Sequence, residues 1–108
     1  MCMLDTDSCI YTIKNKPAGV SARLSEAERG SVCISAITCA ELVNGALKSR
    51  AIEDNLLRLH RLEEVLDIFH FDRDAAEAYG RVRSDLERRG QVIGGLDMLI
   101  AGHAMACD

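Results

Sequence analysis

Short apolar runs alternate with longer amphipathic segments along this chain of 108 residues. Three of the runs are typical of short buried strands: residues 1–4, 32–34 and 65–69. Apolar residues recur at helical spacing in six other segments: 9–14, 20–29, 37–48, 51–62, 73–89 and 96–106. Because strands that alternate with helices favour a parallel sheet with right-handed crossovers, we expect an α/β fold.

Polar capping residues mark the starts of several of these helices. The cluster at residues 5–8 precedes the first helix, and Asp72 precedes the clearest one. After the second strand the sequence leaves two candidate starts, Ser35 and Thr38. The spacing Thr38-x-x-Glu41 matches a capping box.

The length allows a single domain, and we expect it to span residues 1–108. Three short strands make a small sheet that leaves one edge uncovered. A further strand would be expected after the helix at 96–106, so we expect a domain that is incomplete at its C-terminus.

Composition narrows the class of protein. The 48% hydrophobic and 28% charged residues are typical of a soluble globular domain. No apolar run approaches the roughly 20 residues of a membrane helix and no signal peptide is present, so we expect a cytoplasmic protein without a membrane partner. The net charge of −4 argues against a basic nucleic-acid coat, but it allows a nuclease whose acidic pocket is masked by cations.

Three carboxylates stand where apolar runs break off. Asp5 follows the first strand, Glu41 lies early in the helix after the second strand, and Asp97 lies in the first turn of the last helix. Ligands of open α/β sheets bind at the carboxyl ends of the strands, where these residues are expected to meet. Because clustered carboxylates repel one another, such a cluster favours a hard cation and indicates Mg²⁺ chemistry on phosphate esters.

Each carboxylate also has a purely structural interpretation. Asp5 is a good N-cap, and Glu41 is the far half of the possible capping box. Asp97 would be favoured by the helix dipole alone, by roughly 0.3–1 kcal/mol. His103, on the same helix as Asp97, is interpreted as a packed side chain rather than a catalytic base.

The segments around the three carboxylates resemble the PIN-domain toxins of the VapC type. Residues 4–6 read LDT, residues 34–45 fit IS-x-IT-x-x-EL-x-x-G, and residues 93–104 fit IG-x-x-D-x-x-IA-x-HA. The three motifs occur in the family order and at family-like separations, so the resemblance covers the whole chain.

The resemblance implies a PIN-like three-layer α/β/α fold with a short central parallel sheet that lacks its last strand or strands. It also implies an endoribonuclease that depends on Mg²⁺ or Mn²⁺ and hydrolyses RNA phosphodiester bonds. Such a toxin is neutralised by a cognate antitoxin.

The resemblance assigns roles to individual residues as well. Asp5, Glu41 and Asp97 match the catalytic acidic positions, with Asp5 and Asp97 holding the metal and Glu41 positioning a second ion or the attacking water. The backbone amides of Gly94 and Gly95 would receive a substrate phosphate. Asp7 stands where Asn or Ser is common in the family.

Two other functions remain open at this point. Family members continue with a further strand and a TNN or TND segment, so the chain is also compatible with a catalytically inactive remnant that only binds the antitoxin. A small helical regulatory domain, with all three carboxylates acting as caps, is the third interpretation.

The predicted helices carry more apolar surface than three short strands can cover. We expect this excess to form a groove for an antitoxin helix and a homodimer face. The residues concerned are Ile10, Tyr11, Leu24, Leu47, Leu56, Leu57 and Leu59.

Overall fold

The computed structural model of the protein describes residues 2–15, 32–91 and 93–107. The helix expected at 20–29, with Leu24, lies outside the described residues. Three parallel strands form the sheet in the order β1-β2-β3: β1 (Cys2–Leu4), β2 (Val32–Ser35) and β3 (Asp67–Phe69). The strand pairing aligns Leu4 with Ile34 and Ile34 with Ile68. The parallel α/β sheet expected from the sequence is therefore confirmed.

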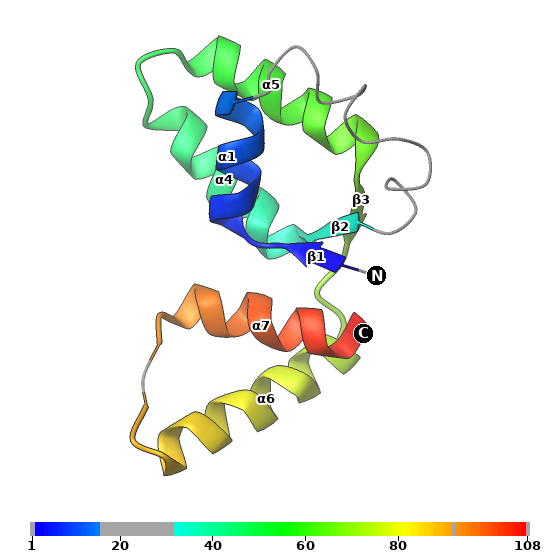
Figure 1. Ribbon diagram of the computed structural model, residues 1–108, viewed down its shortest axis with the longest axis vertical. Coiled ribbons are helices and arrows are strands. Elements are labelled where there is room, and N and C mark those ends of the chain that lie inside the picture. The colour runs from blue at the N-terminus through cyan, green and yellow to red at the C-terminus, as the bar shows by residue number, and fades with distance from the viewer. Residues whose placement is uncertain (1, 16–31, 92, 108) are drawn as a thin grey trace.

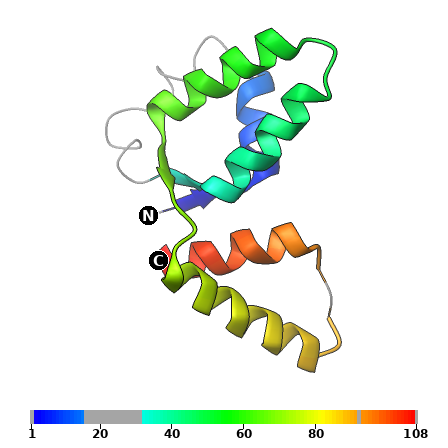
Figure 2. The ribbon, with the colours of Figure 1, turned by 180° about the vertical axis from the view of Figure 1, so that it is seen from behind.

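Helices cover the sheet on two sides (Figures 1 and 2). One group comprises α1 (Thr6–Asn15), α4 (Ala36–Leu47) and α5 (Ile52–Val65). The other is a hairpin of α6 (Arg73–Arg88) and α7 (Gly95–Cys107). None of the helices in the described part of the chain is long and apolar enough to cross a membrane.

The main core lies between the sheet and the first group of helices. Its buried members are Cys9, Ile34, Leu42, Leu59, Leu62, Val65 and Leu66. The core joins β1 and β2 to all three helices of this group, so it fixes the positions at which α1 and α4 begin. Those two helix starts carry the candidate functional residues.

The capping box expected at Thr38 is wrong. The N-cap of α4 is Ser35, whose Oγ accepts a hydrogen bond of 3.0 Å from the Ile37 amide. Thr38 lies inside the helix with its side chain fully buried, and Glu41 lies beyond the first turn. Because β2 runs directly into α4, the first available hydroxyl caps the helix.

Two further boundaries differ from expectation. Helix α1 begins at Thr6 rather than at residue 9, because Asp5 caps it immediately after β1. Helix α5 extends to Val65, and the third strand is correspondingly short. Val65 and Leu66 are buried in the core, which explains why their apolar side chains resembled the start of a strand.

The hairpin of α6 and α7 depends on a close backbone approach. A Cβ atom placed on Gly102 would lie 2.6 Å from the Cα atom of Tyr79 and 2.7 Å from its nitrogen. Asp72 caps α6 through a 3.0 Å hydrogen bond from the Ala75 amide, as the sequence predicted. The turn after α6 contains Gly90 with φ of 69°, a conformation that favours glycine.

Candidate active site

Asp5 lies at the carboxyl end of β1 and caps α1. Its Oδ1 accepts a 2.8 Å hydrogen bond from the backbone amide of Ser8. Hydrogen bonds from the Ser8 amide and then from its hydroxyl lower the pKa of Asp5, and they outweigh a small opposing effect of burial. The exposed carboxylate therefore stays charged to lower pH than an ordinary aspartate.

Glu41 reaches the residue next to Asp5. Its Oε1 accepts a 2.8 Å hydrogen bond from the hydroxyl of Thr6, which begins α1. The contact spans 35 residues of sequence and joins the starts of α1 and α4 at the carboxyl ends of β1 and β2. The sequence placed Asp5 and Glu41 at this edge but gave no role to Thr6, whose position directly after Asp5 was the available signal.

Asp97 lies in the first turn of α7, and its side chain is exposed. The Gly94 carbonyl accepts a 3.0 Å hydrogen bond from the Met98 amide, so Gly94 is the residue that directly precedes the helix. A Cβ atom on Gly94 would lie 3.4 Å from the Asp97 Oδ2 atom. The carboxylate therefore folds back over the exposed Gly94 and close to the helix N-terminus.

The three carboxylates do not form a preformed metal-binding site. Within residues 2–15, 32–91 and 93–107, no three His, Cys, Asp or Glu side chains lie close enough together to hold a metal ion. Mg²⁺, however, is usually held by one or two carboxylates together with water and substrate phosphate. The exposed Asp5 and the half-buried Glu41, at the carboxyl ends of β1 and β2, are oxygen donors that fit a hydrated ion of that kind.

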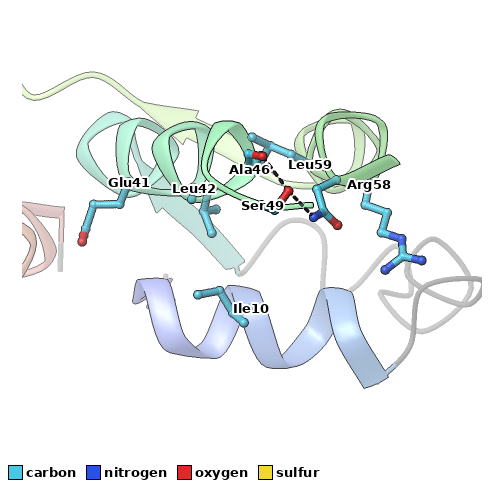
Figure 3. A pocket seen from close by; sticks show the side chains of 9 residues that line it. Ile10, Glu41, Leu42, Ala46, Ser49, Arg58 and Leu59 are labelled. Atoms are coloured by element: carbon cyan, nitrogen blue, oxygen red, sulfur yellow. Dashed lines mark hydrogen bonds between the residues drawn. The ribbon is translucent and has the colours of Figure 1, made fainter. Parts of the chain in front are cut away.

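A groove of about 310 Å³ adjoins Glu41 between α1, α4 and α5. Ile10, Leu42 and Leu59 give it apolar walls, and Figure 3 shows Glu41 and Arg58 at opposite ends of the group of side chains. Ser49 and Asn55 are joined by a 2.8 Å hydrogen bond along it. The groove is thus lined by apolar side chains between an acidic residue and a basic residue. Its full lining is Ile10, Glu41, Leu42, Gly45, Ala46, Ser49, Asn55, Arg58 and Leu59.

His103 is packed, as the sequence indicated. Only 1% of its surface is exposed, its Nδ1 lies 2.7 Å from the Ser35 Oγ atom, and its ring forms a T-shaped pair with Phe71. Burial lowers the pKa of His103, although the charge of Asp72 and a hydrogen bond to the His70 carbonyl oppose the shift. Because Ser35 lies 68 positions before His103, no local sequence pattern indicates this contact.

Comparison with known proteins gives one family and close relatives. The family model described as PIN domain matches residues 2–107. The tRNA(fMet)-specific endonuclease VapC of Shigella flexneri is 44% identical over 102 residues, which are 94% of this chain and 76% of the relative. Ribonuclease VapC2 of Rickettsia felis is 38% identical over 105 residues, 96% of this chain and 78% of the relative.

Solved structures give the same result. The DNA-bound VapBC of Salmonella typhimurium has a TM-score of 0.87 and 41% identity, and the match covers 99% of this chain and 82% of that one. VapBC2 of Rickettsia felis, bound to a DNA fragment from its promoter, has a TM-score of 0.83 and 37% identity, with coverage of 96% and 79%.

Proposed function

The chain is a VapC-type member of the PIN-domain family, and on this premise we propose that it is a Mg²⁺- or Mn²⁺-dependent endoribonuclease toxin. Its substrate is RNA, and its partner is a cognate antitoxin. The observation that carries the proposal is the hydrogen bond from the Thr6 hydroxyl to Glu41, which joins the carboxylate of the second motif to the residue next to Asp5 at one edge of the sheet. Asp97 occupies the start of α7 within the third motif.

The proposed mechanism divides the work among these residues. Asp5 and Asp97 would hold the metal, and Glu41, oriented by Thr6, would position the attacking water and accept its proton. The amides at Gly94 and Gly95 would receive a substrate phosphate at the N-terminus of α7. A bound Mg²⁺ would supply stabilisation of the charge that develops on the phosphate.

One observation favours a second candidate function. The described residues contain no preformed group of three metal-ligand side chains. The same would be expected of an inactive remnant that only binds the antitoxin. An RNA cleavage assay distinguishes the two candidate functions, because only the endoribonuclease would cleave RNA.

The test is an RNA cleavage assay with the purified chain. We expect cleavage with Mg²⁺ or Mn²⁺, none with EDTA, and strong loss in Glu41→Gln. Glu77→Gln is the matched control, since Glu77 pairs with Arg73 on the exposed face of α6. Cleavage that persists in EDTA would overturn the metal dependence. Antitoxin binding without any cleavage by the unmodified chain would favour the second candidate.

The groove beside Glu41 is proposed as the antitoxin site. Among the apolar residues expected at the surface, Ile10, Tyr11, Leu47 and Leu57 are at least 36% exposed, whereas Leu59 is buried and Leu56 is half-buried. Ile10 lines the groove, and the other three exposed residues lie on the helices that form it, α1, α4 and α5. We assign the remaining apolar surface to a homodimer face, which sedimentation of the chain at tens of micromolar would test.

Gly45 offers a direct test of the antitoxin site. It lines the groove, and no heavy atom lies within 4 Å of the Cβ position. Gly45→Phe should therefore fill the groove without disturbing the fold and should weaken antitoxin binding. Gly80→Phe is the matched control, because Gly80 has the same free space on α6. Equal antitoxin affinity in both variants would exclude the groove as the antitoxin-binding site.

A further inference from the structure

A buried polar contact joins α7 to the turn between β2 and α4. Ser35 has no exposed surface and His103 is 1% exposed, which is rare for polar side chains unless they are hydrogen-bonded. Their atoms Oγ and Nδ1 lie 2.7 Å apart. This contact connects the helix that carries Asp97 to the helix that carries Glu41.

Both residues of this contact have a further partner. The Ser35 oxygen also accepts a hydrogen bond from the Ile37 amide, and its hydroxyl can donate to His103 Nδ1 when that nitrogen carries no proton. A backbone hydrogen bond with His70 acts on the imidazole in the direction that raises the pKa of His103. Phe71 meets the ring at a centroid distance of 5.3 Å and an interplanar angle of 77°. The imidazole is thereby held from β2 and α4 on one side and from the β3–α6 link on the other.

The contact has the same sequence spacing to both carboxylates. Ser35 lies six residues before Glu41, and His103 lies six residues after Asp97. At 1.5 Å per residue, each carboxylate is about 9 Å along its helix from the contact. In both views α4 and α7 run in opposite senses across the picture (Figures 1 and 2). Glu41 follows Ser35 along α4, whereas Asp97 precedes His103 along α7.

We propose that Ser35 and His103 are a positioning pair for the candidate active site. Their hydrogen bond sets the angle and register of α7 against the β2–α4 turn, and it thereby keeps Asp97 at the edge where Asp5 and Glu41 lie. Neither residue touches substrate or metal. The inference rests on the proposed function, since positioning matters only if these carboxylates share a site.

Three variants separate positioning from packing. His103→Leu removes the hydrogen bonds and keeps an apolar side chain in the site, whereas His103→Asn keeps a polar atom near the position of Nδ1. Ser35→Gly removes the contact from the other side, and glycine is nearly as good as serine at an N-cap. Met105→Leu is the matched control, because Met105 lies on the same helix with 64% of its surface exposed.

The experiment measures Mn²⁺ affinity by calorimetry and RNA cleavage as separate kcat and KM values, on variants shown to be folded by circular dichroism. We expect His103→Leu and Ser35→Gly to bind Mn²⁺ about tenfold more weakly, as is usual when a residue that supports metal ligands is changed. We also expect both variants to have a lower kcat and an unchanged KM. His103→Asn and Met105→Leu should stay close to the unmodified chain.

Failure of the inference and failure of the proposed function give different results. If the unmodified chain binds Mn²⁺ and cleaves RNA, but His103→Leu and Ser35→Gly behave as it does, the positioning role is overturned and the proposed function stands. If His103→Leu does not fold, Ser35→Gly alone decides in the same way. If the unmodified chain neither binds Mn²⁺ nor cleaves RNA, both proposals fall.

Discussion

At the end of β1, a single carboxylate takes part in two interactions that substitutions can separate. Asp5 caps α1 through the Ser8 amide and is also a proposed metal ligand. Asp5→Asn should keep the cap, because asparagine and aspartate are similar at this position, but it should abolish Mg²⁺-dependent cleavage. Asp5→Ala should lose cleavage and also about 0.5–2 kcal/mol of unfolding free energy. Urea denaturation and a cleavage assay measure the two effects, and an active Asp5→Asn variant would show that Asp5 is only a cap.

The buried imidazole of His103 makes stability depend on pH. Its pKa is lowered in the folded state, so the unfolded chain, with a value near 6.5, binds the proton more tightly. The free energy of unfolding should therefore fall as the pH drops below about 6.5, and this loss should level off below the folded pKa. Melting temperatures between pH 7.5 and 5.5 test this, with His103→Asn as the reference. Equal pH dependence in the two proteins would contradict the prediction.

The positions of the candidate residues were predictable to different degrees. Asp5 and Glu41 could be placed at one edge because each follows a strand of a parallel sheet. The contacts of Thr6 with Glu41 and of Ser35 with His103 could not be predicted, because a hydroxyl beside a helix start is more often a simple cap. Nothing local indicates which distant side chain such a hydroxyl meets.

At the scale of elements, the hairpin of α6 and α7 is held at its closest approach by Gly102. Gly102→Ala would place a methyl group 2.6 Å from the backbone of Tyr79, and backbone cannot move aside as a flexible side chain does. We expect a loss of about 1–3 kcal/mol in unfolding free energy, the usual cost of overpacking.

Gly80→Ala is the matched control for this substitution. Gly80 also lies inside a helix, but nothing lies within 4 Å of its Cβ position. Replacing it should stabilise the protein by about 0.5–1 kcal/mol, because alanine favours helix more than glycine does. Chemical denaturation of both variants measures the difference. If both changes stabilise the protein to the same degree, the contact with Tyr79 does not limit the packing of the hairpin.

Element boundaries were predicted less well than the elements themselves. Apolar periodicity located β1, β2, α4 and α6 within a few residues. The errors arose at junctions without a linker, where β1 runs into α1 and α5 runs into β3. At such a junction a residue such as Val65 can be buried in the core in either a helical or an extended conformation. Hydrophobicity alone therefore cannot assign its secondary structure.

At the scale of the whole molecule, the alternation of strands and helices was enough to predict the parallel sheet and its α/β class. It was not enough to predict how the α6–α7 hairpin sits on the sheet, because that arrangement depends on long-range contacts such as that of His103 with Ser35. The hairpin carries Asp97, so its placement decides whether three separate motifs form one site.

The charge of Asp97 is the most direct test of that site. Asp97 and Asp74 are both exposed aspartates in the first turn of a helix, so a helix-dipole effect alone would make them equivalent. The decisive measurement is the initial rate of Mg²⁺-dependent RNA cleavage by Asp97→Asn and by Asp74→Asn. We predict a loss of about 100-fold or more for Asp97→Asn, from the loss of an anionic metal ligand, and an unchanged rate for Asp74→Asn. Equal, undiminished cleavage by the two variants would contradict the proposed active site.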